Sequence, residues 1–147
     1  MICKPALLDD NYAYMCGLLH DVGIAGAIIS MVGKPGTIAP IEFKTLWPVL
    51  SSIHAQFTIQ LAMLWNLPTE LRTILRHHHT FAIERCPNPM ASVTILAEII
   101  AAGIGAGFEG EESTYLLSKA LELLNLNVSE LEVIEKQARA RLAPNHD

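Results

Sequence analysis

The spacing of apolar residues between the proline and glycine breaks is the feature that most constrains this fold. The breaks lie at residues 33–36, 48, 68, 87–89 and 103–110. Between them apolar residues recur every three or four positions, as Tyr12, Met15, Leu19 and Val22 do, which is the period of one helix face. No stretch alternates apolar and polar residues long enough to support a strand. The chain is therefore predicted to be all-α, a bundle of five to six helices without a sheet.

Capping residues and prolines predict where the helices begin. The expected starts are Asp9 or Asp10, Pro40 for a short helix ending near Leu46, Ser51 or Ser52, Thr69 after Pro68, Pro89, a helix containing Tyr115 to Leu123, and Ser129 followed by Glu130. Trp47 and Trp65 are expected to belong to the core rather than to a ligand site.

Length and charge restrict the class of protein. A chain of 147 residues is expected to form one domain over residues 1–147. The net charge of −5 and the lack of any Lys or Arg run argue against nucleic-acid binding, which needs clustered positive charge. Hydrophobic residues make up 51% of the chain and charged residues only 17%. We therefore expect part of the surface to be covered by a second copy or by another protein.

Cysteines and apolar stretches bear on cellular location. Cys3, Cys16 and Cys86 show no CxxC spacing and no signal peptide precedes them, so reduced thiols in a cytoplasmic protein are expected. The apolar stretch 22–32 is shorter than the roughly 20 residues that span a bilayer, and the stretch 95–108 contains Glu98. Both are expected to be core helices, so no membrane contact is predicted.

Polar side chains that can ligate a metal lie within these apolar helical segments. They are His20 and Asp21 in the run GLLHDVG, His54, the triplet at residues 77–79, and Glu98 between Ala97 and Ile99. An imidazole or carboxylate inside an apolar helix is costly unless it has a partner. Two interpretations are open: the side chains converge on one metal, or they form buried hydrogen-bonded pairs that fix helix ends. Glu98 could equally pair with His20 or with Arg76.

A known family shows the same order of motifs. GLLHDVG is followed by His54, then by Leu64-Trp65-Asn66-Leu67-Pro68, and then by Ile74-Leu75-Arg76-His77-His78-His79. Over residues 10–103 this order resembles the HDOD domain, a regulatory branch of the HD superfamily of metal-dependent phosphohydrolases. The resemblance implies an HD-like helical bundle.

The resemblance also implies a set of site residues. His20 and Asp21 match the pair that names the superfamily, and His54 matches the histidine of the following helix. His78 and His79 match its double histidine, although His77 with His78 is a second alignment. Glu98 falls where catalytic relatives, such as the HD-GYP phosphodiesterases, have a late aspartate. The implied metal ligands are His20, Asp21, His54, His78, His79 and Glu98, and the mixture of nitrogen and oxygen suits Mn, Fe or Ni, with Zn less favoured.

The sequence departs from the catalytic relatives in several positions, and these departures bear on whether the protein is an enzyme. An earlier histidine is expected roughly thirty residues before the HD pair, but only nineteen residues precede His20. The family's upstream helices are therefore expected to be missing. Ile24 stands where catalytic members often have lysine, and no GYP tripeptide follows His79. The sequence thus favours a non-catalytic or weakly catalytic signalling module that acts through protein contacts. The alternative is a phosphohydrolase acting on a nucleotide or cyclic dinucleotide.

Overall fold

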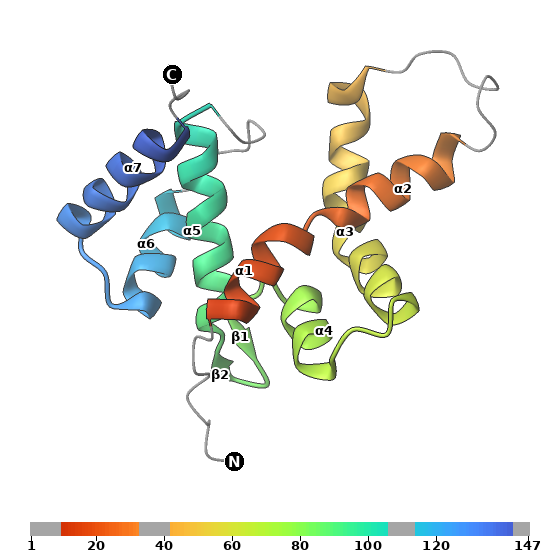
Figure 1. The fold of residues 1–147 in the computed structure, drawn as a ribbon, viewed down its shortest axis with the longest axis horizontal. Helices are drawn as coiled ribbons and strands as arrows, with labels where there is room; N and C mark the ends of the chain where they lie inside the picture. Colours follow the sequence, from red (N-terminus) through yellow and green to blue (C-terminus); the bar gives the residue numbers. More distant parts are fainter. Residues whose placement is uncertain (1–9, 33–41, 106–113, 143–147) are drawn as a thin grey trace. The chain divides into compact units, whose positions relative to one another are not determined.

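The computed structural model describes residues 10–32, 42–105 and 114–142. These residues form seven helical segments and one minimal hairpin: α1 (Asp10–Leu19), α2 (Val22–Val32), α3 (Phe43–Leu64), α4 (Thr69–Arg76), β1 (Ala82–Ile83), β2 (Cys86–Pro87), α5 (Pro89–Gly103), α6 (Thr114–Leu124) and α7 (Val128–Leu142) (Figure 1). The all-α prediction is confirmed. The expectation of no sheet is wrong only for the hairpin, in which Ala82 pairs with Pro87 and Ile83 with Cys86.

The chain divides into two compact units. One contains the described residues from Asp10 to His78, with helices α1 to α4, and we call it the HD unit. The other contains the described residues from His79 to Leu142, and we call it the C-terminal unit. The prediction of one domain over residues 1–147 stays a prediction.

The HD unit has two apolar clusters, one at each side of the α1–α2 turn. The first joins α1, the end of α3 and α4 through Cys16, Ile59, Ala62, Leu71 and Leu75. The second joins α2 to the first half of α3 through Ile24, Ala27 and Leu50. Helix α2 crosses α3 closely, as Figure 1 shows in orange and yellow. Apolar contacts therefore fix both arms of the turn against α3.

Helix α3 differs from the two helices predicted for this region. The expected break at Pro48 is wrong, because the proline lies inside one continuous helix from Phe43 to Leu64. A proline within a helix costs about 3 kcal/mol. Leu46, Leu50 and Ile53 lie on one face and pack in the second cluster of the HD unit. Burial of about 1.5 to 3 kcal/mol per large side chain outweighs the proline.

Asparagine ends two of the helices. Asn66 after α3 and Asn125 after α6 both have φ of 53°, a left-handed conformation that asparagine tolerates better than other non-glycine residues. The following residues close the turn, since the Leu67 amide donates to the Ala62 carbonyl at 3.0 Å and the Leu126 amide to the Leu121 carbonyl at 2.9 Å. These are Schellman motifs. They set the direction in which the chain leaves each helix.

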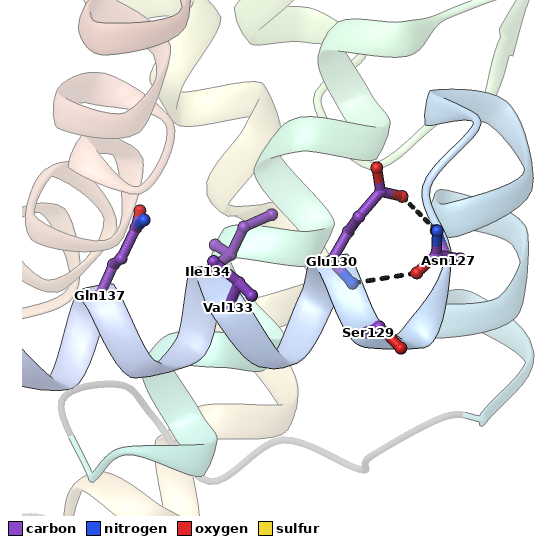
Figure 2. Close-up of a pocket in the computed structure, with 6 residues that line it drawn as sticks. All are labelled: Asn127, Ser129, Glu130, Val133, Ile134 and Gln137. Carbon is purple, nitrogen blue, oxygen red and sulfur yellow. Dashed lines mark hydrogen bonds between the residues drawn. The ribbon is translucent and has the colours of Figure 1, made fainter.

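The C-terminal unit is a three-helix arrangement of α5, α6 and α7, green to blue in Figure 1. Its core contains Leu96, Ile100, Ala120 and Leu131. The cap of helix α7 lies two residues earlier than predicted. Asn127 caps it rather than Ser129: the Glu130 amide donates to Asn127 Oδ1 at 3.0 Å, and the Asn127 amide donates to Glu130 Oε2 at 2.8 Å (Figure 2). This reciprocal pair is a capping box.

Cys16 is buried and forms no disulfide, as expected for a reduced thiol. Cys3 lies outside the described residues, and the expectation of reduced thiols at Cys3 and Cys86 stays a prediction. Trp47 packs half-buried in the second cluster, but Trp65 is 48% exposed, so the prediction that both tryptophans are core is wrong for Trp65.

One stretch of the described residues is long and apolar enough to span a membrane. It is Asp10–Met31, and it meets that test by length and composition only. The prediction from the sequence concerned residues 22–32 in this region and did not include the combined run. In the structure the run is interrupted by the turn at His20 and Asp21, and both of its halves contribute buried residues to the HD unit.

Candidate metal centre

The turn between α1 and α2 positions His20 and Asp21. The first helix was predicted to continue through Val22, but it ends at Leu19, and the second begins at Val22. His20 Nδ1 lies 3.2 Å from the Cys16 carbonyl oxygen and 3.0 Å from that of Gly17. A carbonyl can only accept a hydrogen bond, so Nδ1 carries the proton. The Nε2 atom of a neutral His20 ring then offers a lone pair.

His54 and His78 are held in the same way. His54 lies in α3, and its Nδ1 donates to the Ser51 carbonyl at 2.8 Å. His78 follows α4, and its Nδ1 donates to the Leu75 carbonyl at 2.6 Å. His54 is 6% exposed and His78 is fully buried. In both rings the backbone therefore fixes the tautomer that leaves Nε2 available to a ligand.

The Nε2 atoms of His20, His54 and His78 and the Asp21 carboxylate converge inside the HD unit. His54 Nε2 lies 3.2 Å from His78 Nε2. Asp21 Oδ2 lies 3.2 Å from His20 Nε2, and Asp21 Oδ1 lies 3.5 Å from His54 Nε2. The His20 and His78 rings are also neighbours, with centroids 5.6 Å apart. We call His20, Asp21, His54 and His78 the four-residue cluster.

This ligand set fits a divalent cation. Two lone pairs 3.2 Å apart, as on His54 and His78, repel each other unless a proton or a cation lies between them. Ligand atoms about 2.1 Å from one metal ion are separated by about 3.0 to 3.4 Å at octahedral or tetrahedral angles. The observed separations of 3.2 to 3.5 Å lie close to that range. Three imidazoles and a carboxylate are ligands of Zn, Fe, Mn or Ni.

Electrostatics in the cluster favour an ionised Asp21. Burial alone raises the pKa of the Asp21 carboxyl. Interactions with His20, first its hydrogen bond and then its electrostatic interaction, and smaller interactions with His54 and His78 oppose burial and lower the pKa below its ordinary value. The carboxylate charge is therefore present to balance a proton or a cation held by the imidazoles.

The other two predicted ligands belong to the C-terminal unit. His79 is 42% exposed at its side chain, and its Nδ1 lies 3.8 Å from Oε2 of Glu98 on α5. Their participation in the cluster stays a prediction, as does the choice between the two alignments of the double histidine. Arg76, considered as a partner of Glu98, is exposed at the end of α4 in the HD unit.

Thr58 supports the cluster but was not among the predicted site residues. Thr58 lies one helical turn after His54 on the same face of α3, and its hydroxyl donates to the His20 carbonyl at 2.8 Å. The same hydroxyl accepts from the Gly23 amide at 3.0 Å. A buried threonine four residues after a candidate histidine was the available signal.

A hollow on the C-terminal unit has a different character. It is lined by Asn127, Ser129, Glu130, Val133, Ile134 and Gln137, all from α7 and its cap (Figure 2). Because one helix supplies all of these side chains, the hollow is an open surface groove without converging groups. It lacks the arrangement expected of a catalytic site.

Comparisons with known proteins agree with the motifs of the HD unit. The family model of the HDOD domain matches residues 1–81, more than half of the 147 residues. The match ends before α5, short of the limit near residue 103 inferred from the motifs. No curated protein matches the chain. No solved structure matches it either. Residues His20, Asp21, His54 and His78 all lie within the matched region, and the chain belongs to the HDOD domain family.

Proposed function

We propose that this chain is a regulatory module of the HDOD type that holds one divalent cation in the four-residue cluster. In this proposal it acts through protein–protein contacts rather than through turnover. The observation that carries the metal part is the convergence of Nε2 atoms and a carboxylate at 3.2 to 3.5 Å. Residues fixed by their own backbone need little reorganisation to receive an ion.

Two features of the HD unit favour regulation over catalysis. His54 and His78 are almost completely buried, which suits an ion better than a bulky phosphodiester. The groups that lower the pKa of Asp21 are histidines, whereas phosphoryl transfer needs strong positive charge where charge develops on the substrate. Arg76 is the cation nearest in sequence to the cluster, and it is exposed.

An exposed apolar segment supports the contact role. Met63, Leu64 and Trp65 follow one another at the end of α3 and are 54%, 78% and 48% exposed. Consecutive apolar side chains on a surface are unusual unless they have a partner. We propose that this segment contacts a second copy of the chain or another protein. Sedimentation that finds a stable monomer at micromolar concentration would argue against self-association.

The second candidate function is a metal-dependent phosphohydrolase of nucleotides or cyclic dinucleotides. The ligand cluster favours it, because a bound cation would supply Lewis-acid charge and lower the pKa of a bound water. In that case Asp21, His54, His78 and His20 would hold the ion, with His79 and Glu98 as further candidate ligands.

One set of measurements separates the two functions. Metal content is determined by elemental analysis of protein purified without chelator, and Mn²⁺ binding by calorimetry. Hydrolysis of a generic phosphodiester and of cyclic dinucleotides is then measured with added Mn²⁺. We expect near-stoichiometric metal and negligible turnover. Robust turnover abolished by His20→Ala and Asp21→Ala would make the protein an enzyme, and absence of binding to the native protein would refute the metal site.

A further inference from the structure

The turn that carries His20 and Asp21 leaves two backbone groups, one at the end of α1 and one at the start of α2, without a hydrogen-bond partner inside their own helix. The carbonyl of His20 lies just beyond the end of α1, and the amide of Gly23 lies in the first turn of α2. Neither group has a helical partner at such a position, since the last carbonyls and first amides of a helix lie beyond its hydrogen-bond ladder. Both need a partner from elsewhere when they are buried.

A single hydroxyl serves both groups. Thr58 Oγ1 donates to the His20 carbonyl at 2.8 Å and accepts from the Gly23 amide at 3.0 Å. Thr58 is fully buried. It therefore ties the turn, at the His20 carbonyl before Asp21 and at the Gly23 amide after it, to the helix that carries His54.

The close approach of α2 to α3 depends on glycine at position 23. A Cβ built there would lie 2.5 Å from the Thr58 backbone nitrogen, 2.6 Å from its hydroxyl, and closer still to the His54 carbonyl oxygen. These contacts are shorter than real Cβ atoms show. The absence of a side chain thus brings the turn within hydrogen-bond reach of Thr58.

We propose that Thr58 is a positioning residue for the metal centre: its hydroxyl holds the His20–Asp21 turn in register with His54 and so sets the affinity for the cation. The inference rests on the proposed metal-binding function. The hydrogen bonds of Thr58 go to the His20 carbonyl and the Gly23 amide, so it acts through the backbone of the turn rather than as a ligand. Outer partners of metal ligands typically contribute 10- to 100-fold to affinity.

The test compares Thr58→Val, which removes the hydroxyl at similar volume, with Thr58→Ser, which keeps it. Mn²⁺ affinity is measured by calorimetry on the full chain. We expect Thr58→Val to weaken binding by about 10- to 100-fold and Thr58→Ser to stay within about threefold of the native protein. Thr73→Val is the matched control, because its exposed hydroxyl donates to the Thr69 carbonyl within α4. Ile59→Val controls for a general loss of core stability in α3.

A second readout is independent of metal. Hydrogen exchange of the Gly23 amide reports the bond to Thr58 directly, and it should be faster in Thr58→Val than in Thr58→Ser or Ile59→Val. If the native protein binds Mn²⁺ and Thr58→Val binds it equally well, the positioning role is wrong while the metal site stands. If the native protein does not bind Mn²⁺, the metal proposal fails. The Gly23 exchange rate then decides whether Thr58 holds the turn, and an unchanged rate would overturn that too.

Discussion

Replacing Gly23 with alanine tests the close packing of α2 on α3 that underlies the four-residue cluster. The new Cβ would meet backbone atoms of His54 and Thr58, which cannot rotate away as a flexible side chain could. Relief requires α2 to move by about 1 Å, because ordinary carbon contacts begin near 3.5 Å. That movement loosens the contacts of Ile24 and Ala27 with Leu50 and strains both hydrogen bonds of Thr58.

The change in the free energy of unfolding caused by Gly23→Ala is the sum of opposing contributions. Overpacking a core contact costs about 1 to 3 kcal/mol, and weakening two buried hydrogen bonds adds about 1 to 2 kcal/mol. Alanine is favoured over glycine in a helix by about 1 kcal/mol. The net expectation is a loss of about 2.5 kcal/mol in the free energy of unfolding. At about 4 °C per kcal/mol for a chain of this size, Tm falls by about 10 °C.

Gly17→Ala is the matched control. A Cβ at Gly17 has nothing within 4 Å, and the residue lies exposed in α1. Only the helix preference then changes, so we expect a gain of up to about 1 kcal/mol. Thermal and urea unfolding followed by circular dichroism measure both variants. If Gly23→Ala is as stable as Gly17→Ala, the inferred approach of α2 to α3 is incorrect.

Three further predictions concern the cluster, a helix end and the exposed segment. Saturating Mn²⁺ at 100 times its Kd should raise the stability of the native protein by about 2.7 kcal/mol; calorimetric scans should show this gain, EDTA should remove it, and His54→Ala should lack it while His77→Ala keeps it. Asn66→Gly should leave stability unchanged or slightly raised, whereas Asn66→Val should cost about 1 to 2 kcal/mol because φ is 53°; equal urea midpoints for the two variants would contradict the Schellman assignment. Leu64→Glu should shift sedimentation toward the monomer if the segment at residues 63–65 joins two copies, and Val128→Glu, at an exposed position outside that segment, should not.

The fold was predictable where helix period and punctuation agree. Pro68 and Pro89 marked the starts of α4 and α5 correctly, because proline at a first turn loses no helical hydrogen bond. Pro48 wrongly predicted a break in α3, because local helix preference cannot anticipate how much apolar surface α3 buries on α2. The end of α1 at Leu19 was not predicted either, because it too depends on a distant contact. The His20 carbonyl is satisfied by Thr58, 38 residues later, which is a contact that no local pattern reveals.

The candidate site was predictable as a set of residue types and only in part as geometry. The cost of burying imidazole and carboxylate inside apolar helices singled out His20, Asp21, His54, His78 and Glu98. The HD unit brings the first four of these together. Which nitrogen of each ring faces the cluster depends on hydrogen bonds to the carbonyls of Cys16, Ser51 and Leu75, and these are fixed only once the helix ends are known. The exposure of Trp65 shows the opposite limit: its apolar character indicated burial, but its place after the last turn of α3 left it on the surface.

The turn at His20 and Asp21 also affects how readily this part of the chain would insert into a membrane. It interrupts the run Asp10–Met31, which is otherwise long and apolar enough to enter a bilayer. An aspartate at the centre of a spanning helix costs about 3 kcal/mol on insertion, so Asp21 acts as a barrier to insertion as well as a ligand candidate. Leucine substitutions at His20 and Asp21 would abolish the cluster and at the same time create an uninterrupted apolar helix. Such variants could be lost to membranes or aggregates before any metal is measured, and alanine at His20 with asparagine at Asp21 keeps the two effects apart.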